Sequence, residues 1–145
     1  MDRTALVEIF NQNLEGYDIH KPETILKVSQ KVAAQKQDEL PYSLLTNLAH
    51  ANLWQAFWLK KLAGGRKKSS MTEWRDDFRV PEPTEFDALR FEFISGLREA
   101  ARIAASEPFD HKCSDDQEAI ETLVRIAVHG AYHLGQMVLL KRAKK

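Results

Sequence analysis

The sequence predicts an all-α protein built as a four-helix bundle. Three observations lead to this prediction: apolar residues recur with the 3.6-residue period of an α-helix, alternating β-branched stretches are scarce, and four of the periodic segments are long. The chain has 145 residues, which is the size of one ordinary domain. We therefore expect residues 1–145 to form a single domain around one core.

The ends of the expected helices carry ordinary helix signals. Thr84 and Ser114 are placed to cap the third and fourth long helices, and Gly64 follows the second. A shorter helical piece is expected between the first two long helices. The predicted ranges are about 3–14, 25–34, 43–63, 84–105 and 114–141.

The connection between the second and third long helices is GGRKKSSMTEWRDDFRVPEP. It is much longer than the roughly 2 to 8 residues that usually join antiparallel helices of a bundle. A segment of this length can travel back along the ~30 Å of a 20-residue helix. We therefore expect the second and third helices to run parallel, in an up, down, down, up topology, with Trp74 and Phe78 packing the crossover onto the bundle.

Composition narrows the classes of partner. Lys and Arg together number 21, as do Asp and Glu, so no overall positive field favours nucleic acid. No apolar run approaches the ~18 to 20 residues of a membrane span, and the first residues lack the apolar stretch of a secretion signal. The prediction is a cytoplasmic protein with no nucleic-acid or membrane partner, and the single cysteine, Cys113, fits a reducing compartment.

Histidines in the stretch HGAYHLGQM carry the strongest chemical signal. His129 and His133 lie four residues apart, so their Cβ atoms are roughly 5 to 6 Å apart and both imidazoles can reach one metal ion. Gly130 stands where the zinc-protease motif has its glutamate, which removes the general base of that motif. His50 also faces the apolar side of its helix and is the candidate third ligand. The alternative is that each histidine is an ordinary hydrogen-bonded core residue.

Residues near the histidines have candidate roles in the same site. Gln136 lies one turn beyond His133, so it either orients a ligating imidazole or a bound water, or sits at the bundle edge. Tyr132 either lines the pocket or merely packs. Trp54 and Phe57 are either core residues or aromatic walls of a pocket for an apolar substrate.

Two glycines interrupt the last expected helix. Gly130 and Gly135 each cost roughly 1 kcal/mol relative to alanine in a helix. Close approach of a neighbouring helix would explain them.

The segment FDHKCSDD is a second, weaker candidate. Cys113 precedes the fourth long helix, whose positive end would lower the pKa of its thiol and favour a nucleophilic or redox role. The alternative is that the segment is a polar loop.

The string HGAYHLGQM, preceded some eighty residues earlier by SLLTNLAHANLWQAFWL, resembles the signature of the DinB-like family of damage-inducible four-helix metalloproteins. This family includes the bacillithiol and mycothiol transferases. The likeness covers most of the chain, including HKPETIL and the tryptophan-bearing crossover that ends in proline. The resemblance implies the up, down, down, up topology, a homodimer, and one divalent ion, zinc or nickel, bound with water by His50, His129 and His133.

The leading functional hypothesis is a metal-dependent thiol S-transferase or hydrolase that acts on a small electrophilic molecule. The ion would lower the pKa of a bound thiol or water and present it as the nucleophile, with a low-molecular-weight thiol as the co-substrate of the transferase. Two alternatives stay open. One is a noncatalytic metal- or ligand-binding stress-response protein, and the other is a structural helical dimer whose core histidines are satisfied.

Overall fold

Helices supply all the regular structure in residues 2–143, the part of the chain that the computed structural model describes, which confirms the all-α prediction. None of these helices combines the length and the apolar character needed to cross a bilayer. The four longest are α1 (Thr4–Glu15), α4 (Leu44–Leu62), α6 (Phe86–Ala105) and α7 (Asp116–Arg142). The shorter elements are α2 (Pro22–Ile25), α3 (Gln30–Ala34), α5 (Met71–Asp76) and the 3-10 helix η1 (Pro83–Glu85).

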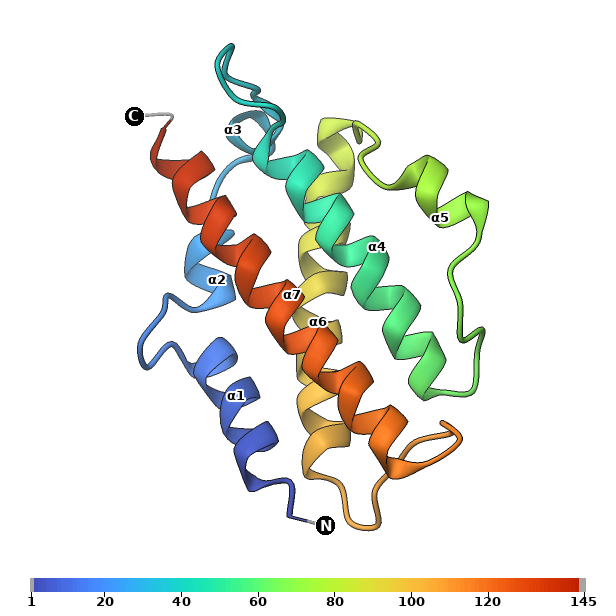
Figure 1. The fold of residues 1–145 in the computed structure, drawn as a ribbon. Helices are drawn as coiled ribbons and strands as arrows, with labels where there is room; N and C mark the ends of the chain where they lie inside the picture. Colours follow the sequence, from blue (N-terminus) through green and yellow to red (C-terminus); the bar gives the residue numbers. More distant parts are fainter. Residues whose placement is uncertain (1, 144–145) are drawn as a thin grey trace.

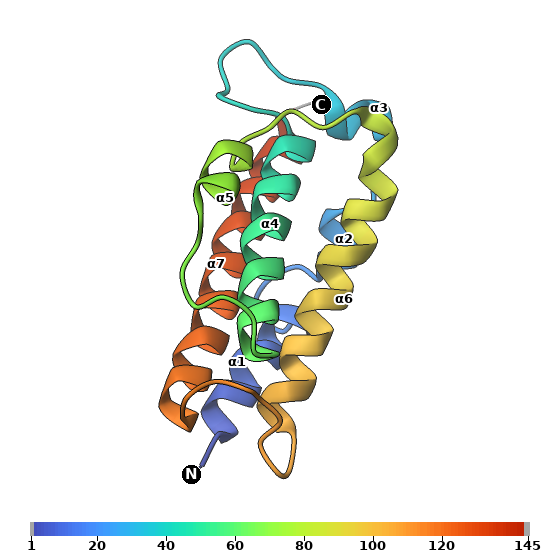
Figure 2. The same ribbon diagram turned by 90° about the vertical axis from the view of Figure 1, so that its right-hand side faces the viewer.

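The long helices lie side by side (Figures 1 and 2). Contacts between α4 and α7 are the most extensive, followed by those between α4 and α6, and α1 packs against α6 and α7. In Figure 1, α4 and α6 both run away from the end of the molecule that holds α3, whereas α1 and α7 run toward it. The segment between α4 and α6 returns along α4 and carries α5 (Figure 2).

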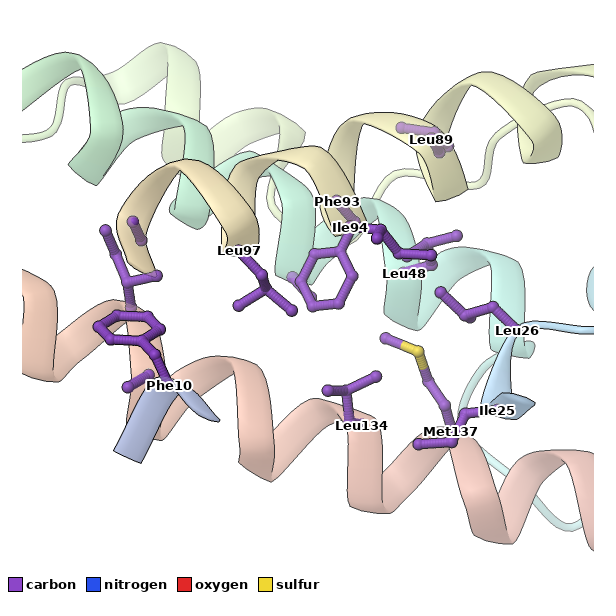
Figure 3. Packing of buried hydrophobic residues seen from close by; sticks show 14 of the residues in the cluster. Phe10, Ile25, Leu26, Leu48, Leu89, Phe93, Ile94, Leu97, Leu134 and Met137 are labelled. Atoms are coloured by element: carbon purple, nitrogen blue, oxygen red, sulfur yellow. The ribbon is translucent and has the colours of Figure 1, made fainter. Parts of the chain in front are cut away.

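The core between these helices is built from large apolar side chains (Figure 3). Phe10 of α1, Phe93 and Leu97 of α6, and Leu134 and Met137 of α7 are all buried. Burying a side chain of this kind contributes roughly 1.5 to 3 kcal/mol relative to leaving it in water. The core therefore fixes which faces of the helices look inward, and with them the positions of the polar residues on those faces.

Two helices, α6 and α7, begin later than predicted because of hydrogen bonds and turns at their N-terminal ends. The predicted cap Ser114 lies one residue too early, because the carboxylate of Asp115 accepts from the backbone N–H of Glu118 at 2.8 Å. The Glu118 carboxylate in turn accepts from the N–H of Ser114, the residue before the cap, at 2.8 Å. Thr84 does not cap α6, since it lies inside η1, a tight turn that precedes that helix.

The helical piece expected at 25–34 is two short helices, α2 and α3. Pro22 occupies the first turn of α2, where its missing N–H costs nothing, so this helix begins earlier than expected. The hydroxyl of Ser29 accepts from the N–H of Val32 at 3.2 Å and begins α3 separately. The end of α4 agrees with the prediction, because Gly64 follows it with a φ of 95°, a conformation that favours glycine.

Candidate metal centre

Three histidines from two helices meet at the contact between α4 and α7. His50 comes from α4, and His129 and His133 come from successive turns of α7. Their candidate ligand nitrogens all lie within 4.8 Å of one another. The ring centroids are 4.3 Å apart for the α7 pair, and 4.4 and 5.2 Å apart for the pairs that include His50. The structure thus brings together the three residues that the sequence pattern selects.

Helix packing places these rings in a largely apolar setting. His50 and His133 are buried, and His129 is half-buried. A Cβ added to Gly130 would lie 3.3 Å from a methyl carbon of Leu97, so this glycine allows α6 to pack closely against α7 beside the cluster, as predicted. The same expectation is wrong for Gly135, where an added Cβ would meet no atom of the described chain within 4 Å.

Hydrogen bonds orient two of the three rings. Nδ1 of His50 lies 2.7 Å from Oδ1 of Asp77, and Nδ1 of His133 lies 3.0 Å from Oδ1 of Asn47. Both oxygens are acceptors, so each Nδ1 donates to its oxygen, and Nε2 is the other ring nitrogen that a metal could use. Within residues 2–143, the hydrogen bonds of His50 are made through Nδ1, His133 also has a side-chain hydrogen bond with Gln136, and no hydrogen bond reaches the ring of His129. Metal-ligating histidines are held in this way, so the donor set fits a divalent ion.

A short polar chain fixes the amide that holds His133. Nδ2 of Asn47 donates to Oε1 of Gln136 at 2.8 Å, and the hydroxyl of Tyr42 donates to the same oxygen at 3.3 Å. This arrangement turns Oδ1 of Asn47 toward the imidazole. Of the two interpretations of Gln136, the one in which it orients an imidazole agrees with this arrangement, because Gln136 holds the amide of Asn47 that contacts His133. Gln136 also has a side-chain hydrogen bond with His133. This contact favours the protonated ring and so opposes, without outweighing, the causes that lower the pKa of His133.

Burial sets the charge of the α7 pair. Desolvation, and then the neighbouring imidazoles, lower the pKa of His129 to about 4 and that of His133 to about 3. Both rings are therefore neutral at pH 7 without any partner charge. Neutral imidazole is the form that binds a metal, so no proton has to be displaced from these two rings at neutral pH.

A pocket of about 660 Å³ opens beside the cluster. Pockets that bind small molecules usually have volumes of roughly 300 to 1,000 Å³. Trp54 and Phe57 line it, so their predicted role as aromatic walls agrees with their position, and Nε1 of Trp54 also donates to Oδ1 of Asp77 at 2.6 Å. The other residues that line the pocket are His50, Trp58, Lys61, Lys67, Lys68, Ser69, Trp74, Asp77, Arg125 and His129.

The crossover contributes aromatic contacts, as predicted. The ring of Phe78 stacks on that of His50 with a centroid distance of 4.0 Å, and the ring of Trp74 meets that of Trp54 at 5.2 Å. These contacts hold the segment that carries Asp77 against α4. Tyr132, by contrast, does not line the pocket: its ring touches that of His133 at 5.1 Å, but the side chain points largely into solvent.

Of the two interpretations of the segment around Cys113, the structure agrees with a polar loop, because residues 106–115 form no helix and the pKa of the thiol is raised rather than lowered. Partial burial of the thiol and the nearby carboxylate of Glu118 raise its pKa above the usual value, although Lys61 and Lys67 act in the opposite direction. The carboxylates of Glu118 and of the capping residue Asp115 both lie in the first turn of α7 or directly before it, so they offset the positive helix end that would favour the thiolate. On balance, the surroundings of Cys113 do not make its thiolate form more favourable than that of an ordinary thiol.

Two positioning residues, Asn47 and Asp77, were missed by the sequence analysis. Asn47 lies three residues before His50, on the same side of α4, and a buried amide in an otherwise apolar helix face is a signal that could have found it. Asp77 belongs to the crossover, where no helical period connects it to the histidines.

The chain was compared with protein-family models, with curated proteins and with solved structures, and none of them matches it. A function for this chain therefore has to be inferred from the geometry of the cluster and its pocket.

Replacing Asp77 with asparagine is expected to weaken metal binding by roughly 10- to 100-fold, because an amide oxygen is a poorer acceptor for the N–H of His50 than a carboxylate. The measurement is a zinc titration in competition with a chromophoric chelator. Asp76→Asn is the matched control, since the neighbouring carboxylate pairs with Arg75 at 3.0 Å and does not touch the histidines. Equal affinities for the two variants would show that Asp77 does not position His50.

Proposed function

We propose that this chain is a metal-dependent enzyme of the DinB-like kind, a four-helix bundle with up, down, down, up topology. In this proposal His50, His129 and His133 hold one divalent ion. The observation that carries it is the convergence of three imidazoles, whose candidate ligand nitrogens lie within 4.8 Å of one another and two of which are held through Nδ1. Zinc or nickel is the expected metal, because imidazole nitrogen suits both ions.

A divalent ion held by three neutral imidazoles supplies a Lewis acid that lowers the pKa of a group bound to it. The chain itself provides orientation through the ring partners Asp77 and Asn47. Trp54, Phe57 and Trp58 provide an apolar wall that excludes water from one side of the pocket. Binding and positioning are therefore the tasks that the protein side chains perform in this proposal.

The lack of a free base favours thiol transfer over hydrolysis. Among the described residues that line the pocket, Asp77 is the only carboxylate, and its Oδ1 already accepts hydrogen bonds from His50 and Trp54. A thiol ionises near pH 8.5 and needs less help to lose its proton than water does. We therefore infer a transferase that joins a low-molecular-weight thiol to a small electrophile.

Positive charge at the pocket suggests that one of the substrates carries an anionic group. Lys61 and Lys67 contact Glu118 at 3.6 and 3.4 Å, so their charges are partly compensated. Lys68 and Arg125 also line the pocket, and no carboxylate of residues 2–143 pairs with either. Arg125 lies one helical turn before His129 on α7, and both residues line the same pocket. A carboxylate or phosphate on the thiol or the electrophile would complement these two cations.

Metal-loaded protein, incubated with glutathione, bacillithiol or mycothiol and a chlorinated nitrobenzene or an epoxide, tests the proposal. The expected result is conjugate formation with at least one thiol, dependent on the metal and lost in the His129→Ala variant. Hydrolysis of activated esters by the same loaded protein, without thiol transfer, would replace transferase with hydrolase. Bound metal with neither activity would identify a noncatalytic binding protein, and no bound metal would leave only a helical scaffold.

A further inference from the structure

All three tryptophans of the chain line the pocket beside the histidine cluster. Trp58 packs against the core, whereas Trp54 and Trp74 lie outside it and contact each other with a centroid distance of 5.2 Å. Trp74 is 60% exposed, although a large aromatic side chain contributes to stability mainly through burial. Packing within the described chain therefore covers less than half of this residue, and a ligand in the pocket would cover more of it.

The aromatic rings that line the pocket are not stacked face to face. Trp54 meets Phe57 and Trp74 at interplanar angles of 77 and 64°, and Trp58 lies tilted to Trp54 at 36°. Offset stacking is the other favourable arrangement of aromatic rings, and a flat ring of a ligand can supply it. A volume of about 660 Å³ is large enough for such a ring system. The walls therefore favour an aromatic ligand over an aliphatic one.

The charged residues of the same pocket are mostly positive. Among the described residues that line it are four lysine and arginine side chains but a single carboxylate, that of Asp77. Glu118 partly compensates two of the cations. The other two, Lys68 and Arg125, have no carboxylate partner among residues 2–143. Cations that share a pocket without a counter-charge repel each other, and an anionic group on a ligand relieves this repulsion.

The order of these groups along the two helices indicates the length of the ligand. On α4, Trp54 and Trp58 follow His50 by one and two turns. On α7, which runs in the opposite direction, Arg125 precedes His129 by one turn (Figure 1). The tryptophans and the arginine therefore lie on the same side of the histidine cluster. Four residues of helix rise about 6 Å, and an aromatic ring with substituents at opposite positions spans a similar length.

We propose that this pocket binds small aromatic carboxylates, with the ring of the ligand against the tryptophans and its carboxylate on Arg125. A guanidinium binds a planar carboxylate through two parallel hydrogen bonds, whereas Lys68 offers a point charge, so Arg125 is the specificity-determining residue. The inference rests on the proposed function, since it assigns the electrophilic substrate of the same pocket to this chemical class. The binding itself uses protein side chains and does not require the metal ion.

Isothermal titration calorimetry of the full chain, stripped of metal with a chelator, tests the selectivity. Metal-free protein is used because a carboxylate also binds zinc directly. Naphthoate is expected to bind about 10-fold more tightly than naphthalenemethanol, which lacks the charge, and several-fold more tightly than octanoate, which lacks the ring. Quenching of tryptophan fluorescence should saturate with the same affinity, because every tryptophan lies at the pocket. Equal affinities for naphthoate and either analogue would overturn the proposal.

Replacing Arg125 with glutamine tests the residue. The affinity for naphthoate should fall about 10-fold, to that of the neutral analogue, whose own affinity should not change. Arg142→Gln is the matched control, since it removes the same charge from an exposed position of α7 that does not line the pocket. Circular dichroism checks that both variants are folded. An equal loss in the two variants would mean that overall charge, and not Arg125, attracts the anion.

These titrations are independent of catalysis. Thiol transfer by the metal-loaded protein, together with no preference for naphthoate, would retain the proposed function and remove this inference. Selective binding of naphthoate by a chain that binds no metal would support the aromatic-carboxylate site and remove the proposed enzyme.

Discussion

Replacing His129 with alanine is expected to reduce bound zinc or nickel from about one ion per chain to less than about a tenth. His129 is the most informative of the three positions, because no group in residues 2–143 hydrogen-bonds to its ring. Its removal takes away a proposed ligand without leaving a buried partner unsatisfied. Loss of a ligand should weaken binding by more than the roughly 100-fold that loss of a supporting hydrogen bond can cause.

Elemental analysis of protein purified without a histidine tag measures this effect, and circular dichroism checks that the variant is folded. His20→Ala is the control, since that exposed histidine lies in the loop between α1 and α2, far along the chain from the cluster. If His129→Ala retained as much metal as the wild type and the His20→Ala control, the ion would be bound elsewhere.

The second prediction with a large expected effect is that acid destabilises the metal-free protein. In the folded protein the pKa of His129 is lowered to about 4 and that of His133 to about 3, whereas an unfolded histidine titrates near 6.5. The unfolded chain therefore binds more protons between these values, so the stability of the metal-free protein should fall as the pH decreases from about 6.5 toward 4. Allowing for the partial exposure of His129, the loss should be on the order of 2 to 4 kcal/mol.

Urea denaturation of metal-free protein at a series of pH values measures how steeply the free energy of unfolding depends on pH; this dependence is the slope compared below. In a variant that carries both His129→Gln and His133→Gln, the two titrating groups are gone and the slope over the same window should be much shallower. A wild-type slope no steeper than that of the double variant would mean that the two imidazoles are not held neutral by the fold. Metal release from the loaded protein is expected in the same acidic range, because protonated imidazole cannot bind an ion.

Helical periodicity accounts for the parts of the site that the sequence analysis found. His129 and His133 share a face because they are four residues apart, and His50 faces inward because its neighbours on the α4 wheel are apolar. The pattern within one helix does not say which other helix it packs against. In the structure, α4 and α7 make the most extensive contact of any pair of helices. This contact brings His50 of α4 together with His129 and His133 of α7.

The residues that sequence analysis missed or misjudged depend on non-periodic structure. Asp77 reaches His50 through a crossover whose path is set by aromatic contacts such as that of Phe78, and no local rule predicts those contacts. The lowered pKa expected for Cys113 followed from the helix end alone, whereas burial of the thiol and then the carboxylate of Glu118 raise this pKa. Sequence patterns predict local effects such as helix faces and helix ends. The contact of Asp77 with His50 and the pKa of Cys113 depend on groups that come together only after folding.

The most direct test of the three-histidine site is X-ray absorption spectroscopy of the protein loaded with one equivalent of zinc or nickel. The proposed site requires three imidazole nitrogens at about 2.0 to 2.1 Å from zinc, with the multiple-scattering signature of histidine, and two in His129→Ala protein loaded at high metal concentration. A spectrum that fits fewer than three imidazoles in the wild type, or that does not change in the variant, would contradict the claim that His50, His129 and His133 bind one ion.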